Sequence, residues 1–313
     1  MTGITGLVCT FNEAHNIAAC LHSMQGVDEL IVADDGSTDR TVEIAESCGA
    51  RVYRRHDEYD VATQADVDAF TERFGWAPEF TAGYRIPAGP ANMYRVWEQA
   101  SYDWIVGIDA DERVTWDLER IRNEAMPLGD HIDCEFVHEH DEHGEPCRVG
   151  HIWKMTKRSQ SEVYGRTHGC LIPKGRVISV PWMRIDHWQT PRPERHWYVL
   201  PIMEYSVLKE DGQRDRFYLG REYRYRDEPE HALTILELYL ERADWPAEIA
   251  KARQYMAHCY QILGQTEQAR EEAVKALLLN PDDSEALTLM ADVYDSHKWR
   301  RLSEAAMNDG VLF

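Results

Sequence analysis

Short apolar runs and amphipathic segments alternate along the first 110 residues. After Asn12 and again after Thr38, apolar residues recur every three or four positions, the spacing of a helix that buries one face. Asn12 is expected to cap the first helix, and Gly49 to end the second. The β-rich apolar runs that we interpret as strands cover 4–11, 28–33, 51–53 and 103–108. Strands that alternate with such helices predict an α/β fold with a doubly wound, mostly parallel sheet.

The segment 57–90 interrupts this alternation. It holds several acids, a group of aromatic residues after Thr71 and a closing R-I-P-A-G-P. Long inserts without structure of their own are usually functional in compact domains. We therefore interpret the segment as an excursion over the edge of the sheet that acts as a lid, with a plain surface insertion as the alternative.

Between residues 130 and 158 the apolar period changes to two. Alternating residues, a turn-rich D-E-H-G-E-P and a second alternating run predict a β-hairpin added to the sheet. His138, His140 and His143 lie around its turn. They suggest either a metal site or, more simply, the polar, solvated tip of the hairpin.

The last third of the chain is patterned as helices. Small residues recur in it as Gly220, Ala257 and Ala291, at intervals of 37 and 34 residues. This spacing is similar to that of tetratricopeptide repeats, which are helix pairs of about 34 residues. We therefore divide the chain into an α/β domain, 1–200, and a tetratricopeptide-like helical domain, 201–313. A plain helical cap is the alternative to the repeats.

Charge limits the partners that the chain can bind. Among 313 residues, 34 Lys and Arg oppose 55 Asp and Glu, which gives a formal net charge of −21. Binding to nucleic acid phosphates needs clustered Lys and Arg, and the sequence has no basic block. Nucleic acid is therefore not expected as the main partner.

The sequence predicts a cytoplasmic protein. No stretch approaches the roughly 18 apolar residues of a membrane span, and residues 1–11 lack the pattern of a signal peptide. Seven cysteines without any C-x-x-C pair favour free thiols in a reducing compartment. The sequence leaves open whether the chain forms a homo-oligomer.

Acidic residues end the strand at 103–108. Asp109, Asp111 and Glu112 follow the apolar run directly. Carboxylates spaced D-x-D offer the hard oxygen ligands that Mg²⁺ and Mn²⁺ prefer, and a diphosphate and water can fill the other positions. For Glu112 the alternative is an acid at a helix N-terminus, where it suits the helix dipole.

Polar clusters also follow the first two strands. T-F-N-E (10–13) ends the first strand, and D-D-G-S-T-D (34–39) ends the second. In a doubly wound sheet the carboxyl ends of the strands face one crevice, where ligands bind. We therefore expect the clusters after the three strands to form one site.

Together, V-C-T-F-N-E, V-A-D-D-G-S-T-D and D-W-I-V-G-I-D-A-D-E closely resemble the nucleotide-sugar-binding half of family 2 glycosyltransferases with the GT-A fold. The resemblance continues, more loosely, into G-R-T-H-G (165–169), I-D-H-W (185–188) and the helical repeats. It is similar to the branch of the family that carries tetratricopeptide-like repeats after the catalytic domain. The resemblance implies a GT-A type sheet followed by an α-helical domain.

The resemblance also implies roles for individual residues. Asp34 and Asp35 would face the base and ribose, and Asp109 would contact the ribose or sugar. Asp111 would be the direct ligand of Mn²⁺ or Mg²⁺, and His187 a second ligand, unless His187 is a strand-end residue packed near Trp188. The residues implied to bind the nucleotide-sugar are Thr10, Asn12, Glu13, Asp34, Asp35, Asp109 and Ala110.

One position departs from the family pattern. Relatives usually have an acid after the histidine of G-R-x-H, where this chain has Gly169. An inverting transferase needs a general base to take the acceptor's proton. His168 is our preferred base, because its unperturbed pKa of about 6.5 suits the task, and Glu162 and Asp186 are the alternatives. Asp109 is implied as the second catalytic residue.

The function implied by the resemblance is a metal-dependent, inverting transfer of a hexose from a nucleotide-diphosphate sugar, with a UDP-sugar as the expected donor. The predicted repeats modestly favour a protein or peptide acceptor, because helical-repeat grooves commonly hold extended segments. A transferase acting on a glycan or a modified nucleobase is an alternative. The other alternative is a repeat adaptor whose transferase domain has lost its activity.

Overall fold

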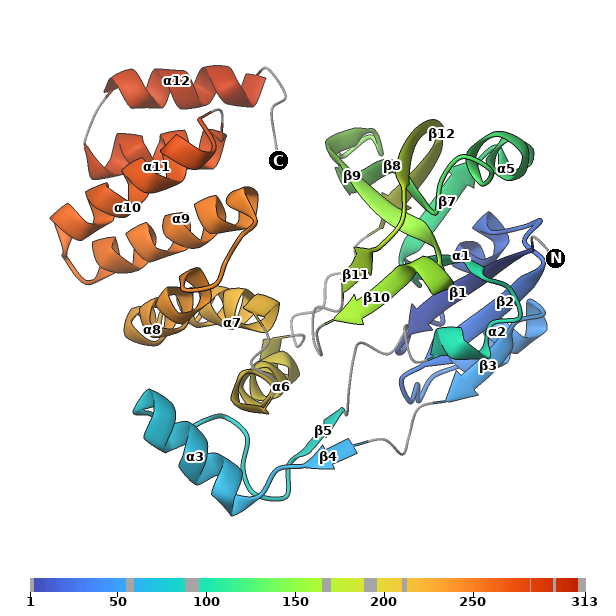
Figure 1. Cartoon of the computed structure of the whole chain (residues 1–313), viewed down its shortest axis with the longest axis horizontal. Helices are drawn as coiled ribbons and strands as arrows, with labels where there is room; N and C mark the ends of the chain where they lie inside the picture. Colours follow the sequence, from blue (N-terminus) through green and yellow to red (C-terminus); the bar gives the residue numbers. More distant parts are fainter. Residues whose placement is uncertain are drawn as a thin grey trace. The chain divides into compact units, whose positions relative to one another are not determined.

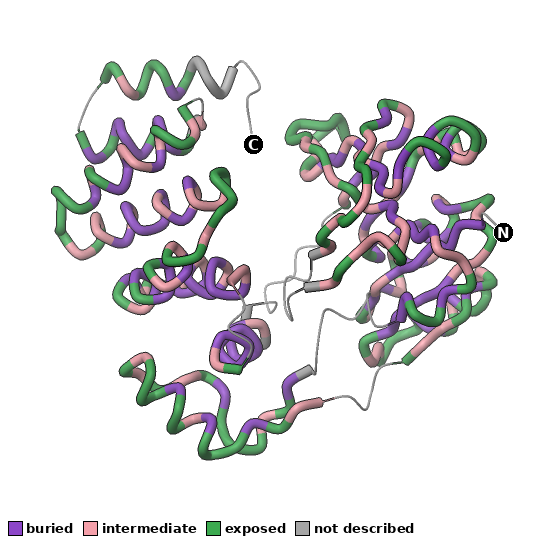
Figure 2. Tube along the Cα trace, in the orientation of Figure 1, coloured by how far each residue is buried: buried purple, intermediate pink, exposed green. Residues whose placement is uncertain are grey.

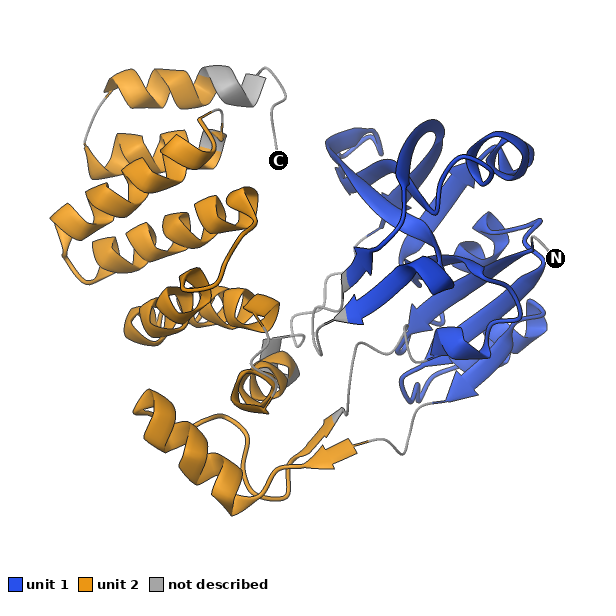
Figure 3. Ribbon diagram, in the orientation of Figure 1, with its two compact units in different colours: residues 1–58, 88–164, 169–193 blue, residues 59–87, 165–168, 194–313 orange. Residues whose placement is uncertain are grey.

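The computed structural model describes residues 3–54, 59–87, 96–164, 170–188, 196–209, 213–281, 283–294 and 297–308. The chain divides into two compact units (Figure 3). The sheet unit comprises 1–58, 88–164 and 169–193, and the helical unit comprises 59–87, 165–168 and 194–313. No helix in the described ranges combines the length and apolarity that a membrane span requires.

The sheet unit is built on a mixed sheet with eight strands among its described residues, in the order β3-β2-β1-β6-β9-β8-β12-β7. The strands β3, β2, β1 and β6 run parallel, and β9 and β7 are antiparallel to their neighbours (Figure 1). The predicted α/β fold is therefore confirmed. The strands are β1 (Ile4–Thr10), β2 (Glu29–Asp34), β3 (Arg51–Arg54), β6 (Trp104–Asp109), β7 (Glu112–Trp116), β8 (His131–His140), β9 (Pro146–Lys157) and β12 (Val177–His187).

Short elements complete the sheet unit. Helix α1 (Ile17–Ser23) buries Ile17, Cys20 and Leu21 against the sheet core, in the predicted spacing. The prediction that Asn12 caps this helix is wrong. Asn12 has a φ of 55°, a left-handed conformation that asparagine tolerates better than most residues, and the helix begins five residues later. The other elements are α2 (Thr41–Ser47), η1 (Trp97–Gln99), α5 (Leu118–Arg120), η2 (Ile121–Ala125), η3 (Arg158–Gln160), β10 (Ser161–Tyr164) and β11 (Cys170–Pro173).

The predicted hairpin is confirmed as β8 and β9, which pair antiparallel around a turn at 141–145. Glu112, by contrast, does not lie at a helix N-terminus. It is the first residue of β7, which pairs with the end of β12. The alternative that explained this acid by a helix dipole is therefore wrong.

The insertion has structure of its own, so the expectation of a structureless excursion is also wrong. It contains β4 (Tyr59–Val61), α3 (Gln64–Phe74) and β5 (Arg85–Pro87). Thr63 and Asp66 form a reciprocal capping box at the start of α3, and Gly75 ends it with a φ of 87°. Phe70 and Phe80 are fully buried in a cluster with Tyr205 of α6 (His196–Lys209). The insertion therefore packs with the helical unit.

The remaining helices pack one after another along the chain (Figure 1). Each helix contacts the next, and α9 also contacts both α7 and α11. Figure 2 shows buried and exposed stretches alternating along these helices, as expected where each buries one face. Gly220 of α7 lies so close to α8 that an added Cβ would meet Leu236 Cγ at 2.6 Å. The helices are α7 (Gln213–Tyr225), α8 (Pro229–Leu240), α9 (Pro246–Ile262), α10 (Thr266–Leu279), α11 (Ser284–Val293) and α12 (His297–Asn308).

A buried polar network joins the insertion to α6 and α7. Glu204 accepts hydrogen bonds from the Tyr223 hydroxyl at 2.7 Å and from the backbone N–H of Glu79 at 2.7 Å. Trp76 Nε1 donates to the same Tyr223 hydroxyl at 3.0 Å, and its ring stacks on His231. Burial raises the pKa of Glu204 to about 7, although both donors favour the ionised carboxylate.

This raised pKa predicts how the stability of the protein depends on pH. The folded state holds the Glu204 proton more tightly than the unfolded chain, so its contribution to the free energy of unfolding falls between about pH 4.5 and about pH 7. Glu204→Gln should remove that fall. Over this range, denaturant unfolding should show the variant gaining roughly 3 kcal/mol relative to wild type. The exposed Glu267→Gln is the control, and a difference between Glu204→Gln and wild type that stays constant with pH would contradict the assignment.

Candidate active site

The structure brings the three polar clusters to one edge of the sheet. In the parallel register, Thr10 of β1 lies beside Asp34 of β2, and Cys9 lies beside Asp109 of β6. The residues after these strands therefore leave the sheet at neighbouring positions. This juxtaposition is the one that the strand pattern predicted.

Hydrogen bonds lock the loop after β1 to the loop after β2. The Asn12 side chain accepts from the Thr38 N–H at 2.8 Å, and the Asn12 N–H donates to Ser37 Oγ at 2.9 Å. The Glu13 N–H donates to Thr41 Oγ1 at 2.8 Å. The left-handed backbone of Asn12 allows the two loops to meet in this way. The hydrogen bonds between the loops join the first two motifs into one surface.

The predicted nucleotide-binding residues differ in how open they are. The buried carboxylate of Asp34 accepts from the N–H groups of Gly36 and Ser37 at 3.1 to 3.3 Å, so it shapes the turn, whereas Asp35 is exposed. Thr10 Oγ1 is buried and has no hydrogen-bond partner in the described part of the chain. An orphaned hydroxyl is costly unless a ligand satisfies it.

Asp111 and His187 lie side by side. Asp111 Oδ2 is 3.4 Å from His187 Nε2, and the Asp111 carbonyl accepts from the Trp188 N–H at 2.8 Å, which ties the D-x-D turn to the end of β12. The hydrogen bond with Asp111 raises the pKa of His187 above its usual range. Separated by 76 positions in the sequence, the two predicted metal ligands thus meet.

The donor set of this pair fits Mn²⁺ or Mg²⁺, with a carboxylate oxygen and an imidazole nitrogen on adjacent strand ends. Among the residues that the structure describes, no cluster of three or more His, Cys, Asp or Glu is arranged to hold a metal ion. A metal here would therefore take further ligands from a bound diphosphate and water. This is the arrangement that the D-x-D spacing suggested.

Lys154 is a site residue that the sequence analysis missed. Its Nζ lies 2.6 Å from Glu112 Oε2 and 3.7 Å from Asp109 Oδ2. The Glu112 side chain is only 3% exposed, and it accepts from the Asp109 N–H at 3.0 Å. Glu112 therefore fixes the backbone of the D-x-D turn, and Lys154 offsets part of the negative charge of the turn.

The histidines of the hairpin are not a solvated tip, so that interpretation is wrong for two of the three. His140 is 7% exposed, lies 3.1 Å from Asp186 Oδ1 and stacks on Trp188. His138 contacts the Phe136 ring, and burial together with nearby cations lowers its pKa. Only His143 is exposed at the turn.

The candidate general bases lie in different surroundings. His168 lies outside the described residues. Glu162 forms an exposed ion pair with Lys174 at 2.8 Å. Asp186 Oδ1 lies 3.1 Å from His140 Nε2, and Asp186 Oδ2 accepts a hydrogen bond from Arg184 Nε at 3.0 Å. Both oxygens are therefore engaged, and neither is open to the acceptor substrate.

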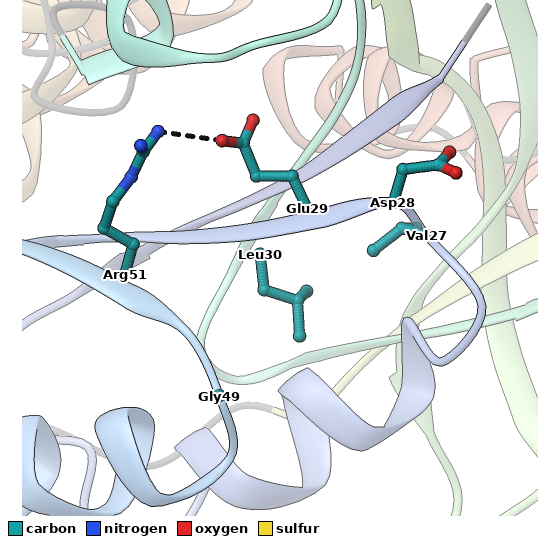
Figure 4. Close-up of a pocket in the computed structure, with 6 residues that line it drawn as sticks. All are labelled: Val27, Asp28, Glu29, Leu30, Gly49 and Arg51. Atoms are coloured by element: carbon teal, nitrogen blue, oxygen red, sulfur yellow. Dashed lines mark hydrogen bonds and ion pairs between the residues drawn. The ribbon is translucent and has the colours of Figure 1, made fainter.

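A pocket of about 340 Å³ lies at the opposite end of the strands (Figure 4). Its polar groups are already paired, because Glu29 binds Arg51 at 2.8 Å and Asp28 binds Arg122 at 2.7 Å. These bonds contribute to the lowered pKa of both carboxyls. The pocket is therefore part of the packing of the strand starts and not of the candidate site.

Comparisons with known proteins find similarity to glycosyltransferases. The model of glycosyl transferase family 2 matches residues 7–64. The lipopolysaccharide core biosynthesis glycosyltransferase LpsC of Rhizobium meliloti is 23% identical over 229 residues, which cover 69% of this chain and 75% of LpsC. An uncharacterized glycosyltransferase of Rickettsia felis is 49% identical over 120 residues, which cover 38% of this chain and 32% of that protein.

Among solved structures, glucosyl-3-phosphoglycerate synthase from Mycobacterium tuberculosis, in complex with Mn²⁺, UDP and glucosyl-3-phosphoglycerate, superposes with a TM-score of 0.37. The identity is 17%, over 66% of this chain and 80% of that one. The family match begins inside β1 and ends at the first residue of α3, so it contains the first two of the three motifs. The chain thus contains a segment that matches glycosyl transferase family 2, within a mixed α/β sheet that is followed by a helical region.

Proposed function

We propose that the chain transfers a hexose from a UDP-sugar to an acceptor hydroxyl with inversion at the sugar, in a metal-dependent reaction. The observation that carries this proposal is the meeting of Asp111 and His187, 3.4 Å apart, at the sheet edge that also holds Thr10, Asp34 and Asp109. That edge offers oxygen and nitrogen donors for a metal ion next to loops suited to a nucleoside.

Each part of the edge then has a separate task. The loops after β1 and β2, with Thr10, Asn12, Glu13, Asp34 and Asp35, hold the base and ribose. Asp109 and Ala110 lie along the sugar diphosphate. Asp111 and His187 bind Mn²⁺ or Mg²⁺, which when bound neutralises charge on the departing diphosphate.

The proposed general base is His168. It would take the proton of the acceptor hydroxyl as that oxygen attacks the sugar carbon from the face opposite the diphosphate. The surroundings of the two alternatives support this choice, because Asp186 has both oxygens engaged and Glu162 is paired with Lys174.

Two observations bear on the acceptor. The stacked helices, which we propose to be tetratricopeptide-like, suit an extended protein or peptide acceptor. LpsC, however, is named for the synthesis of a lipopolysaccharide core, and it is similar to this chain over three quarters of its own length. We therefore favour a glycan acceptor over a peptide.

Release of UDP from a panel of UDP-hexoses tests the proposal. We expect slow UDP release with Mn²⁺ from one of them without any acceptor, loss of release with EDTA, and recovery when Mn²⁺ is restored. His168→Ala should leave UDP binding intact while lowering transfer by roughly 10²-fold. Full turnover in EDTA would refute the metal requirement, and absence of UDP binding would refute the donor.

A further inference from the structure

Trp188 is a large aromatic residue held open next to the proposed metal ligands. It follows His187 directly, and 45% of its surface is exposed. Its N–H donates to the Asp111 carbonyl at 2.8 Å, so its backbone is fixed relative to the D-x-D turn. Neither the metal pair nor the ion pair of Lys154 and Glu112 accounts for the exposed indole.

One face of the indole is already covered. The His140 ring stacks on it with the centroids 4.0 Å apart and 7° between the planes. His140 is in turn held by Asp186 at 3.1 Å, and Asp186 by Arg184 at 3.0 Å. Contacts through the buried side chains of His140 and Asp186 therefore set the orientation of the indole before any ligand arrives, which lowers the entropy lost on binding.

The open face of such an indole has a defined chemical preference. Its π-system is negative on the face, so it attracts groups with a flat array of weakly positive hydrogens. The C–H face of a pyranose ring has this character, whereas the negative face repels anionic groups. A sugar ring is therefore a ligand that the open face suits.

The place of Trp188 along the sheet edge separates it from the nucleoside. The loops proposed to hold the base follow β1 and β2, whereas Trp188 follows β12, on the other side of β6 in the strand order. The D-x-D turn lies between these two positions, because Asp111 bonds to the end of β12.

From this arrangement we propose that Trp188 is the stacking platform for a sugar ring of the acceptor, with His140 and Asp186 as positioning residues. The proposal rests on the proposed function and deepens it, because it makes the acceptor a glycan that ends in a pyranose. The acceptor ring lies on the open indole face, beside the Asp111 and His187 pair.

The test follows the indole N–H of Trp188 by ¹⁵N NMR, with the signal assigned from Trp188→Phe. With UDP and Mg²⁺ present, methyl glucoside, galactoside and mannoside are titrated in turn, because paramagnetic Mn²⁺ would broaden a signal so close to it. We expect one of them to shift the Trp188 signal. Trp188→Ala should weaken that glycoside's binding and raise its KM as an acceptor by roughly tenfold or more, and Trp188→Tyr should restore part of the loss.

Trp153→Ala is the matched control. Trp153 of β9 is 40% exposed, and it precedes Lys154, so its side chain projects from the other face of the sheet. This variant should keep glycoside binding. His140→Gln should shift the Trp188 signal in the free protein and weaken glycoside binding less than Trp188→Ala does, which shows positioning rather than contact.

Two results would overturn the proposal. If UDP alone shifts the Trp188 signal and Trp188→Ala weakens UDP binding, the platform belongs to the donor. If no glycoside shifts the signal and Trp188→Ala transfers at the wild-type rate, the indole binds no acceptor sugar. The UDP and glycoside titrations need only binding, so a failure of UDP release from every UDP-sugar would refute the proposed function separately.

Discussion

Replacing Asp111 with asparagine is expected to lower the rate of hexose transfer by about 10²- to 10³-fold or more. The substitution removes the charged oxygen that we propose as the direct metal ligand, and it leaves His187 as the remaining one. The introduced amide keeps the volume of the carboxylate and an oxygen that accepts from His187, so the free energy of unfolding should change by less than about 1 kcal/mol.

The measurement combines transfer rates over a range of Mn²⁺ concentrations with denaturant unfolding. Glu124→Gln is the control, since Glu124 is an exposed acid of the same unit that pairs with the exposed Arg120. Partial recovery of the Asp111→Asn rate at high Mn²⁺ would fit a weakened metal site. Transfer at the wild-type rate with unchanged Mn²⁺ dependence would exclude Asp111 as a ligand.

The strands and the convergence of the three motifs could be predicted because both depend on local sequence. Apolar β-rich runs identify β1, β2 and β6, and parallel pairing places their carboxyl ends at one edge. The hairpin of β8 and β9 follows from a period of two and a turn. The meeting of Asp111 and His187 needed the family resemblance, since neither strand pattern specifies that β7 pairs with β12.

Lys154 could not be predicted in the same way. In an alternating run a lysine is read as a solvent-facing residue, and its partner Glu112 lies 42 positions away. His140 likewise meets Asp186 across 46 positions. Both contacts depend on the order of the strands in this half of the sheet, β9-β8-β12-β7, which local periodicity does not determine.

Helix α3 is different, because its signals were present in the sequence. Thr63 and Asp66 have the spacing of a capping box, and Gly75 follows at the distance of three turns. The element that α3 packs against could not be predicted from the sequence. Phe70 and Phe80 share a cluster with Tyr205, which lies more than 120 residues later in the chain.

Lys154→Met should destabilise the protein by about 3 to 5 kcal/mol, because it leaves Glu112 as a buried charge without its counter-ion. The Glu112 side chain is 3% exposed, and its lysine partner is 15% exposed. Lys174→Met provides the matched control. The Lys174–Glu162 pair has the same chemistry at 2.8 Å, but both side chains are more than half exposed, so its loss should change the free energy of unfolding by less than about 1 kcal/mol.

Two further measurements distinguish the effect of an unpaired Glu112 charge from the effect of lost Lys154 packing. Combining Lys154→Met with Glu112→Gln should recover most of the lost free energy of unfolding, because the remaining buried group is neutral. Burial raises the pKa of Glu112, so the folded single variant takes up a proton more readily than the unfolded chain. Its stability deficit should therefore shrink as the pH is lowered. Equal losses for Lys154→Met at low and high pH, with no recovery in the double variant, would mean that Lys154 acts through its packing alone.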